Sequence, residues 1–147
     1  MLNWIDAEDQ FEAFFAKKKA FLYAFEDTRE AQKTGGSRRI WTKARPSDYL
    51  ATVNGVTFFA EVKSTSNKTA FPFSMIKPFQ WECAISTTMV GGIYLFFIRS
   101  EMTKIWYKVP ASFMIESLNN NRKSLKWEEL APYVYQPPAV DGPPPAP

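Results

Sequence analysis

The apolar residues of the N-terminal segment recur at intervals of three and four positions, which is the period of an amphipathic helix. Neither proline nor glycine interrupts residues 4–32, and Asp6 stands where an N-cap is expected. The sequence Thr34-Gly35-Gly36-Ser37 follows and favours a flexible loop. The pattern therefore predicts one long helix over residues 4–32.

Two runs rich in Val, Phe and Tyr, Tyr49–Val53 and Val56–Lys63, are typical of β-strands. Asn54-Gly55 separates them, and this dipeptide favours the type I′ turn of a hairpin because both residues tolerate positive φ. A turn of two residues places Val53 opposite Val56. The turn therefore fixes the register of the whole predicted hairpin.

The rest of the chain alternates between strands and helices. In chain order, the pattern predicts a strand at 40–42, an extended piece at 71–76, a helix at 77–90, a buried strand at 93–99, a strand at 104–109, a helix at 111–119 and a helical turn at 126–130. Pro78 in the first turn and Gly91-Gly92 at the end support the first of these helices. This order is typical of an α/β fold, a mixed β-sheet flanked by helices.

Residues 137–147 contain six of the eleven prolines of the chain. A segment of this composition forms neither helix nor sheet, so we expect a disordered, proline-rich tail. Residues 1–136 have the length of one ordinary domain. The sequence therefore predicts a single folded domain followed by a tail.

The chain has no histidine and a single cysteine among its 147 residues. It therefore cannot build a Ser-His-Asp triad, a histidine metal site or an intramolecular disulfide. Carboxylates and lysines must supply any acid–base or metal chemistry. Oxygen ligands of this kind suit Mg²⁺, with Mn²⁺ as an alternative.

The formal net charge of +3 conceals an uneven distribution. Residues 17–45 carry nine basic residues against three acidic ones, whereas residues 1–16 carry four acids and no base. A basic segment of this size favours contact with a polyanion. The residues predicted to bind it are Arg38, Arg39, Lys43, Arg45 and, further along the chain, Lys68.

The predicted hairpin also brings two carboxylates and a lysine onto one face of the strand pair. Its register places Asp48 directly opposite Glu61, and Lys63 leaves from the same face two residues later. Two facing carboxylates destabilise a strand pair unless a cation lies between them. A divalent metal held there, with a lysine beside it, is suited to hydrolysis of a phosphodiester.

Asp48, twelve intervening residues and Glu61-Val62-Lys63 resemble the PD-(D/E)xK nuclease signature. The segment from Ser64 to Pro72 is similar to the RecU segment that follows the catalytic lysine, and Gly35-Gly36-Ser37-Arg38 resembles the loop of Hjc-type resolvases. The resemblance implies a restriction-endonuclease-like core and a Mg²⁺-dependent Holliday junction resolvase. A PD-(D/E)xK nuclease of another substrate class, restriction-like or nicking, and a non-catalytic DNA-binding protein are the alternatives.

The resemblance also implies roles for individual residues. Asp48, Glu61 and the backbone carbonyl of Val62 would bind the metal, and Lys63 would be the catalytic lysine. The first helix would add a glutamate, either Glu12, which matches best, or Glu8 one turn earlier. Two further residues would assist: Ser37 at the scissile phosphate, and Gln80 in orienting Lys63 or a water.

Branched DNA is the partner that the resemblance implies, bound by a homodimer because two symmetric cuts need two sites. The 16% aromatic content also favours a dimer interface. RecU proteins are longer and carry a stalk, for which the connection after Pro72 leaves little room, so the length is more similar to Hjc-type or phage-encoded resolvases. We find no signal peptide and no membrane-spanning stretch, so we expect no membrane partner and a cytoplasmic location.

Overall fold

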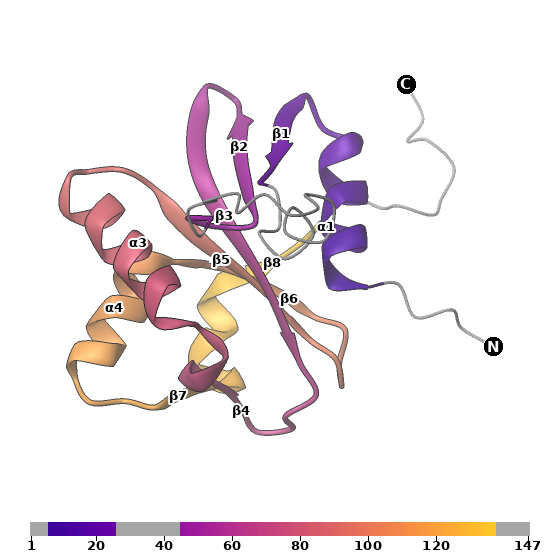
Figure 1. Ribbon diagram of the computed structural model, residues 1–147. Coiled ribbons are helices and arrows are strands. Elements are labelled where there is room, and N and C mark those ends of the chain that lie inside the picture. The colour runs from indigo at the N-terminus through magenta and orange to yellow at the C-terminus, as the bar shows by residue number, and fades with distance from the viewer. Residues whose placement is uncertain (1–5, 26–44, 138–147) are drawn as a thin grey trace, which may run out of the picture.

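Within the residues that the computed structural model describes, 6–25 and 45–137, six strands form one mixed β-sheet (Figure 1). In sheet order these strands are β1 (Ala20–Ala24), β2 (Tyr49–Val53), β3 (Val56–Thr65), β5 (Tyr94–Ser100), β6 (Trp106–Pro110) and β8 (Val134–Tyr135). β3 runs parallel to β5, and the other neighbouring pairs are antiparallel. The predicted mixed sheet is therefore confirmed.

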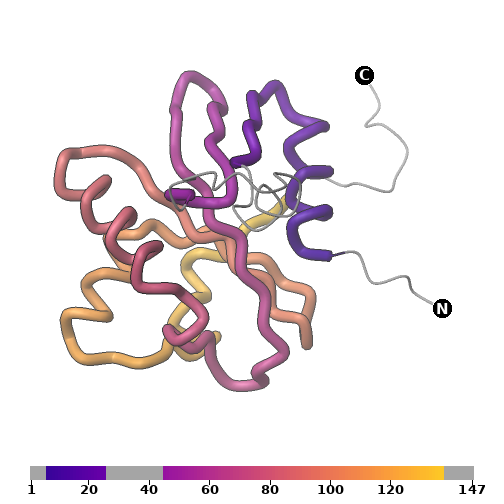
Figure 2. Tube along the Cα trace, viewed as in Figure 1, coloured from indigo at the N-terminus to yellow at the C-terminus, as the bar shows by residue number. Residues whose placement is uncertain are grey.

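The β2–β3 hairpin has the register that its turn predicts. Val53 pairs with Val56, and Tyr49 pairs with Ala60 at the other end of β2. Asn54 and Gly55 have φ values of 51° and 79°, in the left-handed region that a type I′ turn requires. β3 extends well beyond β2 and continues alongside β5 (Figure 2). The second half of β3 is thereby carried into the middle of the molecule.

Helices cover both faces of the sheet, as predicted. α1 (Ala7–Ala16) packs on one face, where Phe11 and Phe14 join a buried cluster with Phe97 of β5. α3 (Pro78–Met89) and α4 (Ala111–Asn119) lie on the other face, around a second cluster that includes Phe96. Every residue of β5 is buried between these layers, which confirms the buried strand predicted at 93–99.

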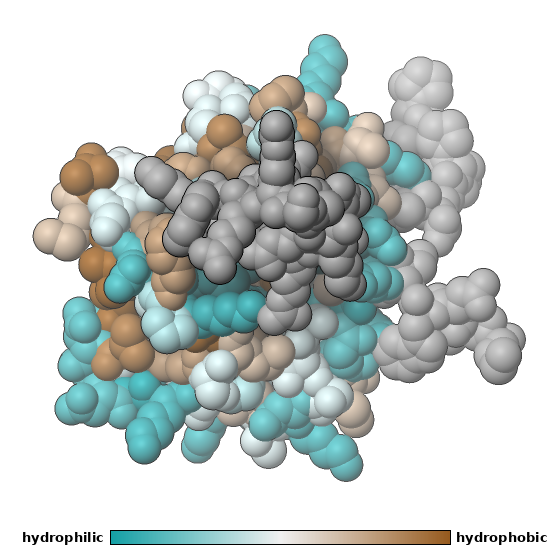
Figure 3. All heavy atoms as spheres, in the orientation of Figure 1, coloured by the Kyte–Doolittle hydropathy of each residue, from teal (hydrophilic) through white to brown (hydrophobic). Residues whose placement is uncertain are grey.

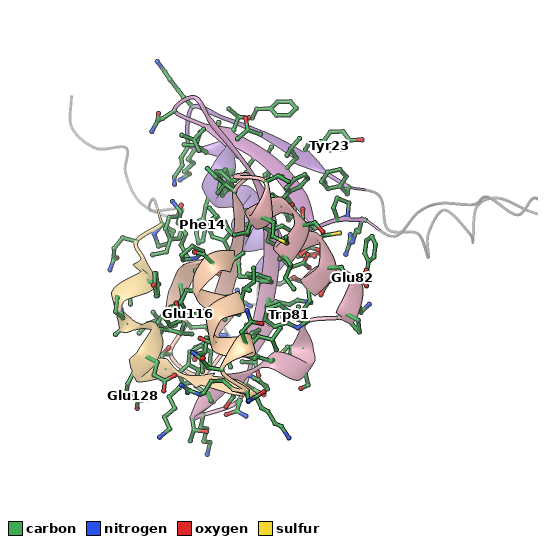
Figure 4. All side chains as sticks on the ribbon, turned by 90° about the vertical axis from the view of Figure 1, so that its left-hand side faces the viewer. Phe14, Tyr23, Trp81, Glu82, Glu116 and Glu128 are labelled. Carbon is green, nitrogen blue, oxygen red and sulfur yellow. The ribbon has the colours of Figure 1, made fainter. Side chains whose placement is uncertain are left out.

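The single helix predicted over residues 4–32 is wrong beyond residue 16. α1 ends at Ala16, and β1 follows and pairs with β2. The apolar residues of β1 fit both a helical and a strand period, and backbone pairing with the edge of β2 decides in favour of the strand. Leu22 packs against the core, whereas Phe21 and Tyr23 are more than half exposed, and Tyr23 points away from the sheet (Figure 4). Residues 26–32 lie outside the described residues.

Shorter elements connect the layers. β4 (Ala70–Pro72) pairs with β7 (Ser124–Lys126) in a separate small sheet, and 3₁₀ helices occupy Phe73–Met75 and Trp127–Tyr133. The helices predicted at 77–90 and 111–119 and the turn predicted at 126–130 are confirmed to within three residues. β7 and β8 are too short to give a sequence signal. The strand predicted at 40–42 and residues 138–147 of the predicted tail lie outside the described residues.

Hydrophobic side chains gather on the surface over the C-terminal end of α3 (Figure 3). Met89, Val90 and Ile93 are between 41% and 85% exposed there. Over the described ranges, this apolar surface does not continue into a membrane-spanning helix, because none of the helices there combines the length and the apolar character needed to cross a bilayer.

Candidate active site

Asp48 and Glu61 lie opposite each other at the open end of the β2–β3 hairpin. Asp48 comes directly before β2, Glu61 lies within β3, and each is the next residue beyond the last observed pair of the hairpin, Tyr49 with Ala60. Their side chains are only 4% and 2% exposed. Oδ2 of Asp48 accepts a 2.8 Å hydrogen bond from the backbone N–H of Val62. The structure therefore brings together the two carboxylates that the sequence predicts.

The two oxygens of Glu61 have different surroundings. Gln80 Nε2 donates a 3.1 Å hydrogen bond to Oε1, and Lys63 Nζ lies 3.8 Å from the same atom. Oε2 is buried and finds no hydrogen-bond partner within the described residues. A buried acceptor without a partner destabilises the folded state. The position beside Oε2 is therefore suited to a cation or a proton.

The pKa of the Glu61 carboxyl group lies far above its ordinary value. Burial raises its pKa, the charge of Asp48 raises it further, and Lys63 opposes the shift, which together give a pKa of about 9. Without a cation, Glu61 therefore holds a proton at neutral pH. A divalent cation that binds here competes with that proton.

Arg45 balances the charge of Asp48 from the solvent side. Its Nη2 lies 2.9 Å from Asp48 Oδ1, and its Nη1 donates a 3.4 Å hydrogen bond to the backbone oxygen of Phe25. The sequence predicts Arg45 as a DNA-binding residue. In the structure its guanidinium group forms an ion pair with Asp48, a candidate metal ligand. About one third of its side chain remains exposed and available to a phosphate.

Glu8 is the glutamate of α1 that lies beside the paired carboxylates. Burial, followed by the charge of Asp48 and a hydrogen bond with it, raises the pKa of Glu8 to about 7. Glu12, which the sequence favours, instead accepts a 2.9 Å hydrogen bond from the hydroxyl of Tyr49. The two glutamates are one helical turn apart on the same face, so the sequence alone could not separate them.

Gln80 connects the site to the beginning of α3. Its Oε1 accepts a 2.9 Å hydrogen bond from the backbone N–H of Lys77, and its Nε2 is the donor to Glu61. The amide therefore satisfies a free N–H at the helix N-terminus and fixes one oxygen of Glu61. The structure thus links Gln80 directly to Glu61, and its predicted role in orienting Lys63 or a water stays a prediction.

The donor set suits a hard divalent cation. Asp48 and Glu61 offer carboxylate oxygen atoms, and Oε2 of Glu61 is an acceptor that a cation would satisfy. The carbonyl of Val62 stays the predicted further ligand. In the described part of the chain, no three His, Cys, Asp or Glu side chains already form a metal-binding group. Two carboxylates completed by carbonyl, water and substrate oxygens are the usual way in which proteins hold Mg²⁺.

The remaining predicted site residues cannot be related to the paired carboxylates, or lie in an exposed connection. Ser37, Arg38, Arg39 and Lys43 lie outside the described residues. Lys68 is exposed in the connection between β3 and β4.

Sequence reasoning missed Tyr94, whose hydroxyl donates a 2.7 Å hydrogen bond to the backbone oxygen of Pro46 and so holds the segment that leads to Asp48. A tyrosine in an apolar strand gives no signal that separates it from ordinary core.

The metal-free protein is expected to lose stability as pH rises from 5.5 to 8.5. Glu61 and Glu8 have pKa values raised above those of the unfolded chain, so the folded state keeps protons that the unfolded state releases. The stability they contribute is complete below pH 4.5 and is lost as pH approaches 9. Urea unfolding in EDTA should show a fall on the order of a few kcal/mol, since each retained proton changes stability by about 1.4 kcal/mol per pH unit. Stability that rises over this range would contradict the burial of Glu61 as an acid.

The chain is similar to several curated proteins. It is 34% identical over 101 residues to the Holliday junction resolvase RecU of Staphylococcus epidermidis, covering 62% of this chain and 49% of that protein. It is 31% identical over 90 residues to the Holliday junction resolvase RecU of Shouchella clausii, covering 60% and 44%. The chain thus spans about half the length of the curated relatives it matches.

A solved structure shares the fold. It is that of Archaeoglobus fulgidus Hjc, a Holliday junction resolvase from an archaeal hyperthermophile, with a TM-score of 0.55 and 13% identity. The match covers 88% of this chain and 93% of that one, and it confirms the predicted restriction-endonuclease-like fold. The family model for RecU, Recombination protein U, matches residues 9–141, most of the chain. On that match, the chain belongs to the RecU family.

Proposed function

We propose that this chain is a metal-dependent endonuclease that cuts four-way DNA junctions. The observation that carries the proposal is the buried pair Asp48 and Glu61, with Lys63 beside it and Oε2 of Glu61 unsatisfied among the described residues. Two ionised carboxylates in such a pair destabilise the strand pairing, and a bound divalent cation would offset their repulsion and supply the chemistry of phosphodiester hydrolysis. Membership of the RecU family and the names of the curated relatives support branched DNA as the substrate.

Asp48, Glu61 and the carbonyl of Val62 are the proposed ligands of Mg²⁺ or Mn²⁺, with Glu8 at their side. When bound, such an ion polarises a phosphate and lowers the pKa of water. Lys63, whose side chain is 14% exposed, would hold the attacking water and stabilise the charge that develops on the phosphate. Arg45 is placed to contact a neighbouring phosphate with its exposed part.

The substrate is tested by comparing a synthetic four-way junction with a linear duplex of the same sequence. With Mg²⁺ we expect the junction to be cut at least about tenfold faster at matched salt, a difference of about 1.4 kcal/mol in barrier. With EDTA we expect no cleavage. Equal rates would instead assign the chain to a PD-(D/E)xK nuclease of another substrate class.

Asp48→Asn separates catalysis from binding in the same assay. The asparagine keeps an acceptor for the N–H of Val62 but removes the charge that a cation needs. We expect the variant to bind the junction in EDTA as the parent does and to lose cleavage in Mg²⁺. A parent protein that binds junctions tightly and never cuts them would favour the non-catalytic alternative.

We also propose that the protein acts as a homodimer, because resolution of a four-way junction needs two symmetric cuts. The exposed hydrophobic residues Met89, Val90 and Ile93 are compatible with an interface. Sedimentation equilibrium at micromolar concentration should give twice the chain mass. The cytoplasmic location remains a prediction.

A further inference from the structure

α1 carries polar residues on both sides of the stripe that it buries. With 100° between successive residues, Gln10 and Glu8 project to opposite sides of the stripe formed by Ala7, Phe11, Phe14 and Phe15, each about 80° from its centre. Glu8 lies on the side of Asp48, and Gln10 lies on the side of β5 and β6. The two sides of the helix are therefore in contact with different parts of the sheet.

The contacts of Gln10 are made with buried donors. Its Oε1 accepts a 2.7 Å hydrogen bond from Arg99 Nη1 and a 3.0 Å hydrogen bond from Trp106 Nε1. Arg99 and Trp106 are opposite each other on β5 and β6 and are only 5% and 2% exposed. Arg99 is held in turn by Glu101, whose Oε1 lies 2.7 Å from Arg99 Nε. One amide oxygen thus joins α1 to a rigid, buried part of the sheet.

The apolar contacts of α1 do not fix its rotation in the same way. Hydrophobic burial has no direction, and the phenylalanines of α1 contact several rings at angles that range from tilted to edge-on. Hydrogen bonds do have direction. On the far side from Gln10, Tyr49 donates to Glu12. The helix is therefore held on both sides, and Glu8 is one turn from the second of these contacts.

We propose that Gln10 is a positioning residue, which sets the rotation of α1 through Arg99 and Trp106 and thereby presents Glu8 to Asp48 at the metal site. The inference rests on the proposed function, because Glu8 matters there as a group beside the cation. Gln10 itself is bonded through Oε1 to Arg99 and Trp106, so we expect it to act on the metal site only through Glu8. Its effect is on how tightly the site formed by Asp48 and Glu61, with Glu8 beside them, binds the metal.

The test uses the full chain with two substitutions at one position. Gln10→Met keeps the length and helix propensity of the side chain but removes the acceptor. Gln10→Glu keeps an acceptor oxygen for both donors. Asp9→Asn, at an exposed neighbouring position on the same helix, is the matched control.

Mn²⁺ binding without DNA is measured by isothermal titration calorimetry, and the Mg²⁺ dependence of junction cleavage is measured beside it. For Gln10→Met we expect the Kd for Mn²⁺ and the half-saturating Mg²⁺ concentration to rise five- to tenfold, with a less than threefold loss of rate at saturating Mg²⁺. Gln10→Glu and Asp9→Asn should stay within twofold of the parent. Junction binding in EDTA should not change in any of them.

Equal Mn²⁺ affinity of Gln10→Met and the parent overturns the proposal, as does a Gln10→Glu variant that is as weak as Gln10→Met. If Gln10→Met does not fold, Trp106→Phe removes one of the two donors and keeps an aromatic ring. It should raise the Kd two- to threefold, and an unchanged Kd overturns the proposal equally.

Crystal structures of the metal-free parent and Gln10→Met separate this inference from the proposed function. We expect the Glu8 carboxyl to leave hydrogen-bonding range of Asp48 in the variant, and an unchanged position overturns the inference. If the parent binds no Mn²⁺ or cuts no junction, the proposed function fails, and the two crystal structures still decide whether Gln10 positions Glu8.

Discussion

Glu61→Gln is expected to abolish DNA cleavage and, at the same time, to make the metal-free protein more stable. The glutamine fills the same space and can still accept from Gln80, but it is neutral without a bound proton, whereas Glu61 must keep a proton to be neutral beside Asp48. The loss of a metal ligand should lower the cleavage rate by about 10³-fold or more, which corresponds to about 4 kcal/mol in barrier. The stability gain should be about 1 kcal/mol or more at pH 8, or about 2–4 °C in Tm.

The pH dependence makes this prediction specific. Because Glu61 has a raised pKa in the folded state, the advantage of glutamine should grow from pH 5.5 to 8.5. Thermal unfolding in EDTA at both pH values measures it. Glu116→Gln, at an exposed position of α4 (Figure 4), removes a charge away from the site and should change neither cleavage nor the pH dependence. A Glu61→Gln variant that melts below the parent at pH 8 would show that the carboxylate is well paired.

Lys63→Ala is expected to lower junction cleavage by about 10²–10³-fold while binding is preserved. The lysine is the cation beside Glu61, and removal of one donor to the developing charge typically has an effect of this size. Cleavage is measured under single-turnover conditions in Mg²⁺, and binding is measured in EDTA.

Lys108→Ala is the matched control for Lys63→Ala, since Lys108 is an exposed lysine of β6. It removes the same charge and should leave the rate within about twofold, because an isolated surface charge contributes little. Cleavage by Lys63→Ala at the rate of the parent would remove Lys63 from the mechanism. An equal loss of binding and cleavage would instead identify Lys63 as a DNA contact.

The candidate site was predictable where local chemistry decides the structure. Asn54-Gly55 specifies its own turn, and the turn fixes which residues face each other across β2 and β3. The positions of Asp48, Glu61 and Lys63 follow from that register without any contact between distant segments. The helix of α3 was predictable for a similar reason, because Pro78 starts it.

Features that depend on distant segments could not be predicted in this way. The stretch that forms β1 suits helix and strand equally, and only the edge of β2 decides between them. The choice between Glu8 and Glu12 depends on how α1 is rotated on the sheet. That rotation is set by partners such as Tyr49, 37 positions away from Glu12, and Arg99, 89 positions away from Gln10. A sequence pattern carries no record of such contacts.

The last strand of the sheet has a consequence for the order in which the protein folds during synthesis. β8 pairs with β6, and the hydroxyl of Tyr135 accepts from the ammonium group of Lys18, a contact that joins residues 117 positions apart. β3, in turn, can pair with β5 only after α3 has been made. Asp48, Glu61 and Lys63 therefore leave the ribosome before α3 and β5, which help to enclose them. A nascent chain would carry the carboxylates and the lysine of the proposed site without this supporting structure, and we expect the site to be completed late in synthesis, once β8 has paired with β6.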